Sequence, residues 1–143
     1  MAGYMTKLMG YVYDGAHTAA EKLQNGVLAV IDTDGVTAAG AADATFRVAP
    51  EGKTTLWGMN ALTLDVVDAG TTELFLVENE WDINDAEEYD TSKYELEAGK
   101  LVRMHRLLPG EQFIMTVADD VYGGVEVGDT VAPAAGGTVA KKA

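Results

Sequence analysis

The residues with the greatest capacity for chemistry lie in one acidic run. Between positions 78 and 97 the chain carries nine acidic residues and a single base, Lys93. Carboxylates this close together can bind a hard cation such as Ca²⁺, or share the acid and base roles of glycoside hydrolysis. The same composition is also typical of a hydrated loop, so the spacing has to distinguish these functions.

The acidic run does not match the calcium-binding loop of an EF-hand. That loop needs oxygen ligands at alternating positions, Gly at the sixth position and Glu at the twelfth. Counted from Asp82, Asn84 fits the third position, but Ala86 and Glu87 occupy the fifth and sixth. Lys93 stands at the twelfth, so the pattern fails.

A less regular calcium site remains an alternative for the same run. Its ligands would be Asp82, Asn84 and Asp85. The interpretation that we favour is a hydrated loop anchored by Trp81 and Tyr89, because aromatic side chains can hold a segment while its carboxylates stay in water.

The remaining sequence offers no set of catalytic residues. A glycosidase needs one carboxyl group in an apolar pocket, and this run has no apolar surroundings. Ser92 is the only serine, cysteine is absent, and the two histidines, His17 and His105, are far apart. No glycine-rich phosphate-binding pattern occurs. We therefore expect no enzyme activity, no catalytic residue and no cofactor.

A basic pair lies near the acidic run on an expected strand. Arg103 and His105 alternate, so their side chains should share one face of that strand, and we expect this face to be exposed. The favoured interpretation is a basic stripe that pairs with neighbouring acids. The alternative is an electropositive contact for a partner.

Composition limits the possible partners. The 143 residues suit a single domain, and a hydrophobic content of 48% is enough for one core. The net charge of −13 repels phosphate backbones, so we expect no nucleic acid. No stretch approaches the roughly 20 apolar residues of a membrane helix, so we expect no membrane contact.

One segment carries a helix signal. Thr18 with Glu21 three residues later has the spacing of a capping box, and Asn25–Gly26 offers a left-handed stop. A helix of about two turns is therefore predicted between these residues.

The rest of the chain reads as short strands separated by turns. Apolar or alternating runs at 26–32, 36–39, 44–50, 54–59, 61–67, 72–78, 94–117 and 121–133 are separated by Gly, Asp, Asn and Pro. This pattern predicts a mainly β fold, a single-domain β-sandwich or small barrel with one short N-terminal helix. We expect an arm or first strand at 1–13, a β-rich domain at 14–131 and a flexible Ala/Gly-rich tail at 132–143.

The N-terminal segment is rich in side chains that need burial. An extended arm could bury them in a neighbouring subunit, and a first strand would bury them in its own domain. The candidate contact residues are Tyr4, Met5, Leu8, Met9 and Tyr11.

Three motifs together resemble a known family. An aromatic-Asp-Gly precedes a Thr-Ala-x-x-x-Leu-x-Asn-Gly turn, an "AGKxVR" step follows the acidic middle, and a "PGxxF" hairpin comes next. In this order they are similar to the small capsid decoration, or cement, proteins of tailed bacteriophages. The matching positions are 13–15, 18–26, 98–103 and 109–113.

The resemblance implies a structural virion protein, made in the host bacterial cytoplasm, on the capsid exterior. Its partners would be the major capsid protein and further copies of itself, with a trimer favoured. It would bind the outside of the expanded shell and stabilise it, through contacts repeated by symmetry. Two alternatives stay open: a tail-tube or tail-associated subunit, and a calcium- or carbohydrate-binding β module.

Overall fold

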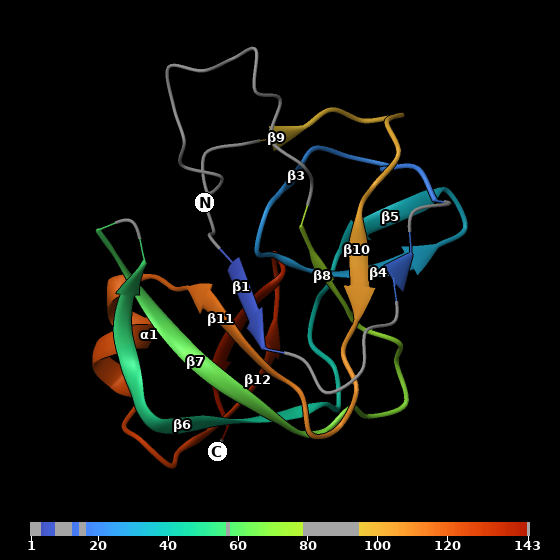
Figure 1. The fold of residues 1–143 in the computed structure, drawn as a ribbon. Coiled ribbons are helices and arrows are strands. Elements are labelled where there is room, and N and C mark those ends of the chain that lie inside the picture. Colours follow the sequence, from blue (N-terminus) through green and yellow to red (C-terminus); the bar gives the residue numbers. More distant parts are fainter. Residues whose placement is uncertain (1–3, 8–12, 15–16, 57, 79–94, 143) are drawn as a thin grey trace.

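The computed structural model describes residues 4–7, 13–14, 17–56, 58–78 and 95–142. These residues form three antiparallel sheets and one short helix (Figure 1). The prediction of a mainly β fold is confirmed, and the arrangement is compatible with a β-sandwich. No helix of the described residues is both long and apolar enough to cross a membrane.

The larger sheet has six strands in the order β1-β11-β7-β6-β12-β13. Its two edges are β1, the first strand of the described residues, and β13, the last. The strands are β1 (Tyr4–Lys7), β6 (Thr45–Leu56), β7 (Met59–Asp68), β11 (Gln112–Thr116), β12 (Thr130–Ala134) and β13 (Thr138–Lys141).

A long hairpin forms the middle of this sheet. Strand β6 alternates as its sequence predicts: Phe46 and Val48 are buried, while Arg47 is exposed. The hairpin turns at Gly58, whose φ of 78° is left-handed and therefore suits glycine. β6 and β7 run beside each other along the lower left of Figure 1.

The second sheet has five strands in the order β2-β10-β8-β4-β5. Two further short strands, β3 and β9, pair only with each other. The bounds are β2 (Tyr13–Asp14), β3 (Leu23–Gln24), β4 (Leu28–Asp32), β5 (Gly35–Ala38), β8 (Phe75–Val77), β9 (Glu95–Leu96) and β10 (Met104–Arg106).

Isolated pairings curl the five-stranded sheet towards a barrel. At its β5 edge, Ala19 pairs with Val36, and the adjacent Thr18 pairs with Leu101. The chain from Leu101 then runs directly into β10, which is already in the sheet. Close approach is required here, because a Cβ at Gly35 would collide with the carbonyl oxygen of Thr18.

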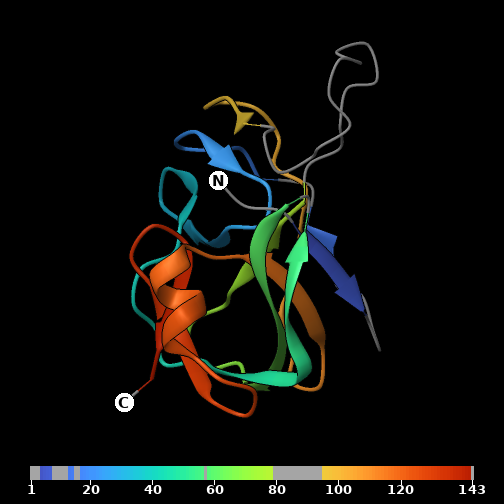
Figure 2. The ribbon, with the colours of Figure 1, turned by 90° about the vertical axis from the view of Figure 1, so that its left-hand side faces the viewer.

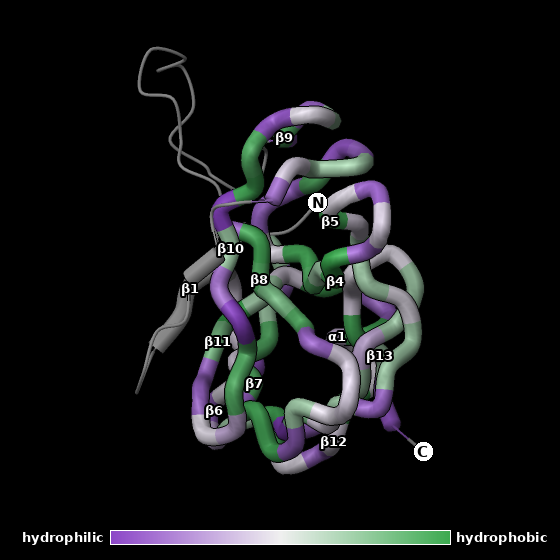
Figure 3. Tube along the Cα trace, turned by 90° about the vertical axis from the view of Figure 1, so that its right-hand side faces the viewer, coloured by the Kyte–Doolittle hydropathy of each residue, from purple (hydrophilic) through white to green (hydrophobic). Residues whose placement is uncertain are grey.

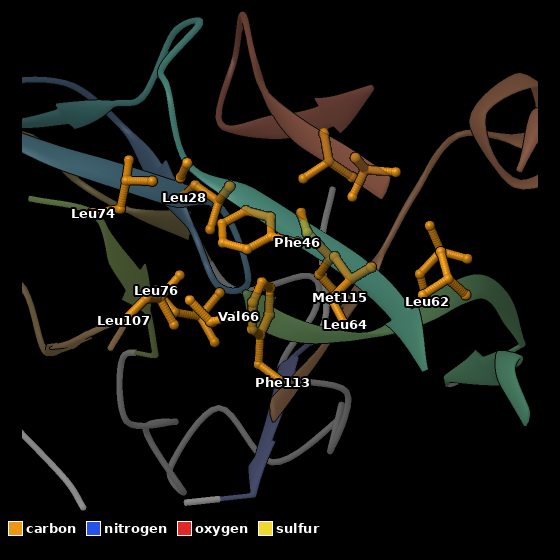
Figure 4. Packing of buried hydrophobic residues seen from close by; sticks show 14 of the residues in the cluster. Leu28, Phe46, Leu62, Leu64, Val66, Leu74, Leu76, Leu107, Phe113 and Met115 are labelled. Atoms are coloured by element: carbon orange, nitrogen blue, oxygen red, sulfur yellow. The ribbon is translucent and has the colours of Figure 1, made fainter. Parts of the chain in front are cut away.

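The two sheets enclose a main core. Phe46 of β6 and Phe113 of β11 meet edge to face, with ring centroids 5.3 Å apart and an interplanar angle of 88°. Leu28, Leu74 and Leu76 reach this core from the other sheet or its connections (Figure 4). A second, smaller cluster lies within the curled sheet and consists of Ala19, Leu23, Ala29, Val36, Phe75, Val77, Leu96, Val102 and Met104.

The helix expected from Thr18 to Asn25 is absent, and that prediction is wrong. The amide of Ala19 donates instead to the carbonyl oxygen of Lys100 (2.8 Å), and the amide of Ala20 to that of Val36 (2.9 Å). These pairings satisfy the backbone with neighbouring strands. A helix of two turns is marginal by itself and cannot compete with them.

The two local signals of that segment have other uses. The Glu21 carboxylate accepts a hydrogen bond from the amide of Ala38 (2.9 Å), so it fastens β5 and caps no helix. The left-handed turn predicted at Asn25–Gly26 is confirmed, because Gly26 has a φ of 85°. Gly26 donates its amide to the carbonyl oxygen of Val77 (2.7 Å).

The flexible tail expected at 132–143 is also wrong for the described residues up to 142. β12 and β13 form a hairpin, and Val131 and Val139 are fully buried in the main core. The Ala- and Gly-rich sequence packs because Val131 and Val139 supply the apolar contact. Each is worth roughly 1.5–3 kcal/mol when buried.

The single helix of the described residues lies near this hairpin rather than near the N-terminus. It is α1 (Asp119–Gly124), on the side of the C-terminal strands (Figure 2). Lys53 of β6 fastens it, with its ammonium 4.5 Å from the centre of the Tyr122 ring and 2.9 Å from the carbonyl oxygen of Val125. The described chain therefore has one short helix, but in a different place from the one predicted.

At the N-terminus, residues 4–7 form a strand. β1 pairs antiparallel with β11, placing Tyr4 opposite Met115 and Lys7 opposite Gln112. Of the two alternatives for this segment, the structure thus has the first strand over these four residues. In the second sheet, the tube of Figure 3 is coloured as hydrophobic along β4 and β8.

Candidate functional site: a buried Glu–His–Glu cluster

Three ionisable side chains meet in the interior near the junction of the two sheets. His105 lies in β10, between Tyr13 of β2 and Leu76 of β8 in the strand register. Its neighbour Met104 belongs to the smaller core, so the imidazole projects from the opposite face of the strand. The exposed fraction of His105 is 0%.

A carboxylate stands at each ring nitrogen of His105. Nδ1 is 2.5 Å from Oε1 of Glu78, and Nε2 is 3.8 Å from Oε2 of Glu111. Glu78 is 4% exposed and Glu111 2%, so all three side chains are removed from bulk water. The shorter contact is a hydrogen bond, while the longer one is an ion pair only when the imidazole is protonated.

Backbone hydrogen bonds hold both glutamates in place. Glu78 directly follows β8, and its amide donates to the carbonyl oxygen of Arg103 (2.9 Å). Glu111 precedes β11. Its carbonyl oxygen accepts from the amide of Val66 in β7 (2.9 Å), and its own amide donates to Leu108 (3.1 Å). The cluster therefore joins the end of a strand in one sheet to two strands of the other.

The two carboxylates have unequal surroundings. Among the described residues, neither carboxylate oxygen of Glu111 has a hydrogen-bond partner. Burial raises the pKa of Glu111, the nearby Glu78 carboxylate adds to the rise, and His105 opposes it. A buried carboxylate without hydrogen bonds is costly when ionised, which is why burial is the largest cause of the raised pKa.

This geometry suits proton binding better than metal binding. The two carboxylates lie at opposite nitrogens of one imidazole ring, whereas metal ligands must converge on a single point. Within the described part of the chain, no three His, Cys, Asp or Glu side chains are placed to hold a metal ion. The cluster is also closed to solvent, so no substrate reaches it in this conformation.

The expected exposure of His105 is wrong. The prediction assumed that the face shared by Arg103 and His105 would meet water. β10 is an inner strand of its sheet, and both of its faces are covered at His105. Two carboxylates make this burial tolerable by pairing with the ring. Arg103 is half-buried, and its role as a partner contact stays a prediction.

Sequence reasoning missed both glutamates as members of a site. Each adjoins an apolar strand, in "LFLVE" and "EQFIM", and an acid at such a border is a weak signal of burial. Their pairing with His105 depends on three separate segments, so no local spacing could have revealed it.

The other predicted site residues are not brought to this cluster. Tyr4 and Met5 lie in β1, at the edge of the larger sheet. The remaining candidates lie outside the described residues: the arm residues Leu8, Met9 and Tyr11, and the calcium candidates Asp82, Asn84 and Asp85.

A groove of about 380 Å³ lies between the β3–β4 turn and the end of β11. None of its lining residues is titratable, and they include Val27, Met59 and Met115. A neighbouring hollow of about 250 Å³ shares Gln24, Val27 and Gly136 with it. The smaller hollow is also lined by Lys22 and Glu95, which form an exposed ion pair (3.7 Å).

Comparison of the chain with protein-family models, with curated proteins and with solved structures found no match.

Proposed function

We propose that this chain is a structural virion protein that binds the outer surface of a phage capsid, as a homo-oligomer, and stabilises the expanded shell. The observation that carries the proposal is that two motifs of the family resemblance, far apart in sequence, pair with each other. The amide of Ala19 donates to the carbonyl oxygen of Lys100 (2.8 Å), and the amide of Gly99 donates to the carbonyl oxygen of Ala19 (2.8 Å).

The third motif also has a defined place in the fold. Gly110 of the "PGxxF" segment has a φ of 92°, which permits the turn into β11. Phe113 then enters the main core against Phe46. The resemblance thus concerns residues that set turns and strand pairing, which supports a common fold as its basis.

One of these motifs also supplies a candidate contact. Leu101 is 63% exposed, more than any other large hydrophobic side chain of the described residues. It lies in the "AGKxVR" step beside Lys100, which is also exposed. A single exposed leucine makes a weak contact, but many copies on a symmetric shell bind through avidity.

The first experiment measures copy number. Particles purified from the source culture are analysed by mass spectrometry, relative to the main shell protein. We expect hundreds of copies per particle at a fixed ratio to the shell protein. A few copies would move the chain to the tail or a vertex, and its absence from particles would overturn the proposal.

The second experiment tests the contact. Purified chain is sedimented with expanded shells that lack it, and Leu101→Asp is compared with Val127→Asp. Val127 is 50% exposed and lies outside the motif, so it is the matched control. We expect affinity to fall about tenfold or more for Leu101→Asp and to stay unchanged for the control. Equal affinities would remove Leu101 from the contact.

A third experiment addresses the N-terminal segment. Deletion of residues 1–9 removes β1, which pairs only with β11 in the described sheet. We expect a folded domain that no longer binds shells. If the truncated chain unfolds instead, β1 is required for the core and the arm alternative is refuted.

A further inference from the structure

The Glu–His–Glu cluster connects the two sheets through ionisable groups. Glu78 directly follows β8 of the five-stranded sheet, and His105 lies within that sheet. Glu111 enters the six-stranded sheet and is bonded through its backbone to Val66. The side-chain contacts therefore cross from one sheet to the other. The protonation of these side chains changes how strongly the two sheets are held together.

Counted over Glu78, His105 and Glu111 alone, the charges do not balance. With the imidazole protonated, two carboxylates and one cation leave one net negative charge in a buried place. With the imidazole neutral, the excess is two. When the imidazole is protonated, one additional proton on Glu111 makes the three side chains neutral. Glu111 is also the carboxyl group whose oxygens have no hydrogen-bond donor among the described residues.

Other charged side chains that belong to these elements or directly adjoin them include Arg103, Arg106 and Asp65. Arg106 contacts Glu73 at the surface (3.6 Å), and Asp65 of β7 accepts a hydrogen bond from Gln112 (2.7 Å). Arg103 is half-buried and directly precedes β10, and its carbonyl oxygen accepts a hydrogen bond from the amide of Glu78 (2.9 Å). The side chains of β2, Tyr13 and Asp14, lie outside the described part.

We propose that Glu78, His105 and Glu111 form a proton-operated latch between the two sheets, which is strongest when Glu111 holds a proton and weakens as the pH rises. The latch does not depend on the proposed function in a virion, because it follows from the contacts of one chain. A failure of shell binding would leave it untouched.

The direction of the pH effect follows from linkage. The pKa of Glu111 is raised from its ordinary value of 4.5, so the folded chain binds more protons than the unfolded chain above that pH. The stabilisation is complete below the unfolded value. It is lost as the pH rises through the folded value.

The test compares the melting temperature of wild type, Glu111→Gln and Glu126→Gln between about pH 4 and pH 8. Gln keeps the shape but cannot ionise, and Glu126 is an exposed control. We expect the melting temperature of Glu111→Gln to rise relative to wild type as the pH increases, with no such trend for the control. Parallel curves for Glu111→Gln and wild type would overturn the latch.

A second measurement begins with the wild-type chain, so its first result does not depend on whether Glu111→Gln folds. The side-chain carboxyl carbon of Glu111 is followed by NMR during a pH titration. We expect a midpoint above 4.5, moved higher in His105→Gln because the imidazole opposes the rise. A midpoint at or below 4.5 in the wild type, or no change in His105→Gln, would overturn the proposal.

Discussion

Replacement of Val139 by alanine tests whether the C-terminal hairpin belongs to the main core. Val139 is fully buried and lies opposite Pro133 in the β12–β13 pair. The substitution removes two buried carbon groups, each worth about 0.8 kcal/mol. A cavity contribution adds to this, so we expect the free energy of unfolding to fall by about 2–3 kcal/mol.

The matched control is Val67→Ala. Val67 also lies in a strand, β7, but is 42% exposed, so it shares the loss of β propensity without the loss of core contacts. We expect a decrease below about 1 kcal/mol for this variant. The difference between the two variants therefore reports burial alone.

The assay is urea unfolding followed by circular dichroism. For Val139→Ala we expect a lower midpoint with an unchanged slope, because the surface exposed on unfolding stays almost the same. If Val139→Ala is no less stable than Val67→Ala, residues 138–141 are not anchored in the core. The original expectation of a flexible tail would then be correct.

Two further predictions concern an aromatic pair and a surface carboxylate. Phe46→Leu and Phe113→Leu should each destabilise the fold. A double-mutant cycle measured by urea unfolding should give a coupling free energy of about 0.5–1.5 kcal/mol from the edge-to-face contact of the two rings. Strictly additive effects of the two substitutions would contradict this prediction. Asp43→Asn should lower the melting temperature at neutral pH, because hydrogen bonds from the amide and hydroxyl of Thr71 hold the pKa of Asp43 below its ordinary value of 3.8. That stabilisation is present above 3.8 and is lost as the pH falls through the lower folded value, so a pH-independent difference between Asp43→Asn and wild type would refute this reasoning.

The strands of the middle hairpin could be predicted because their signals are local. Alternation in β6 places Phe46 inside and Arg47 outside by backbone geometry alone. Turns at Gly26 and Gly58 follow from the left-handed conformation that glycine adopts at little cost. The strand β4, the turn after it and strand β5 were readable for the same reason.

The helix at 18–25 was mispredicted because its local capping residues compete with backbone hydrogen bonds to residues that are distant in sequence. Its capping residues have the right spacing, but Ala19 and Ala20 bond to Lys100 and Val36 instead. The candidate site shows the same limit. An alternating histidine suggests an exposed face, and only the contacts with Glu78 and Glu111 explain its burial.

The sequence by itself determined the β class, the turn positions and the acidic surface charge, since each depends on neighbouring residues or on composition. Tertiary structure decided which strands pair, where the C-terminal hairpin packs and how His105 is buried between two carboxylates. These features join segments that are distant along the chain. Their free energy comes from excluding water and pairing buried polar groups, which exist only after the sheets have come together.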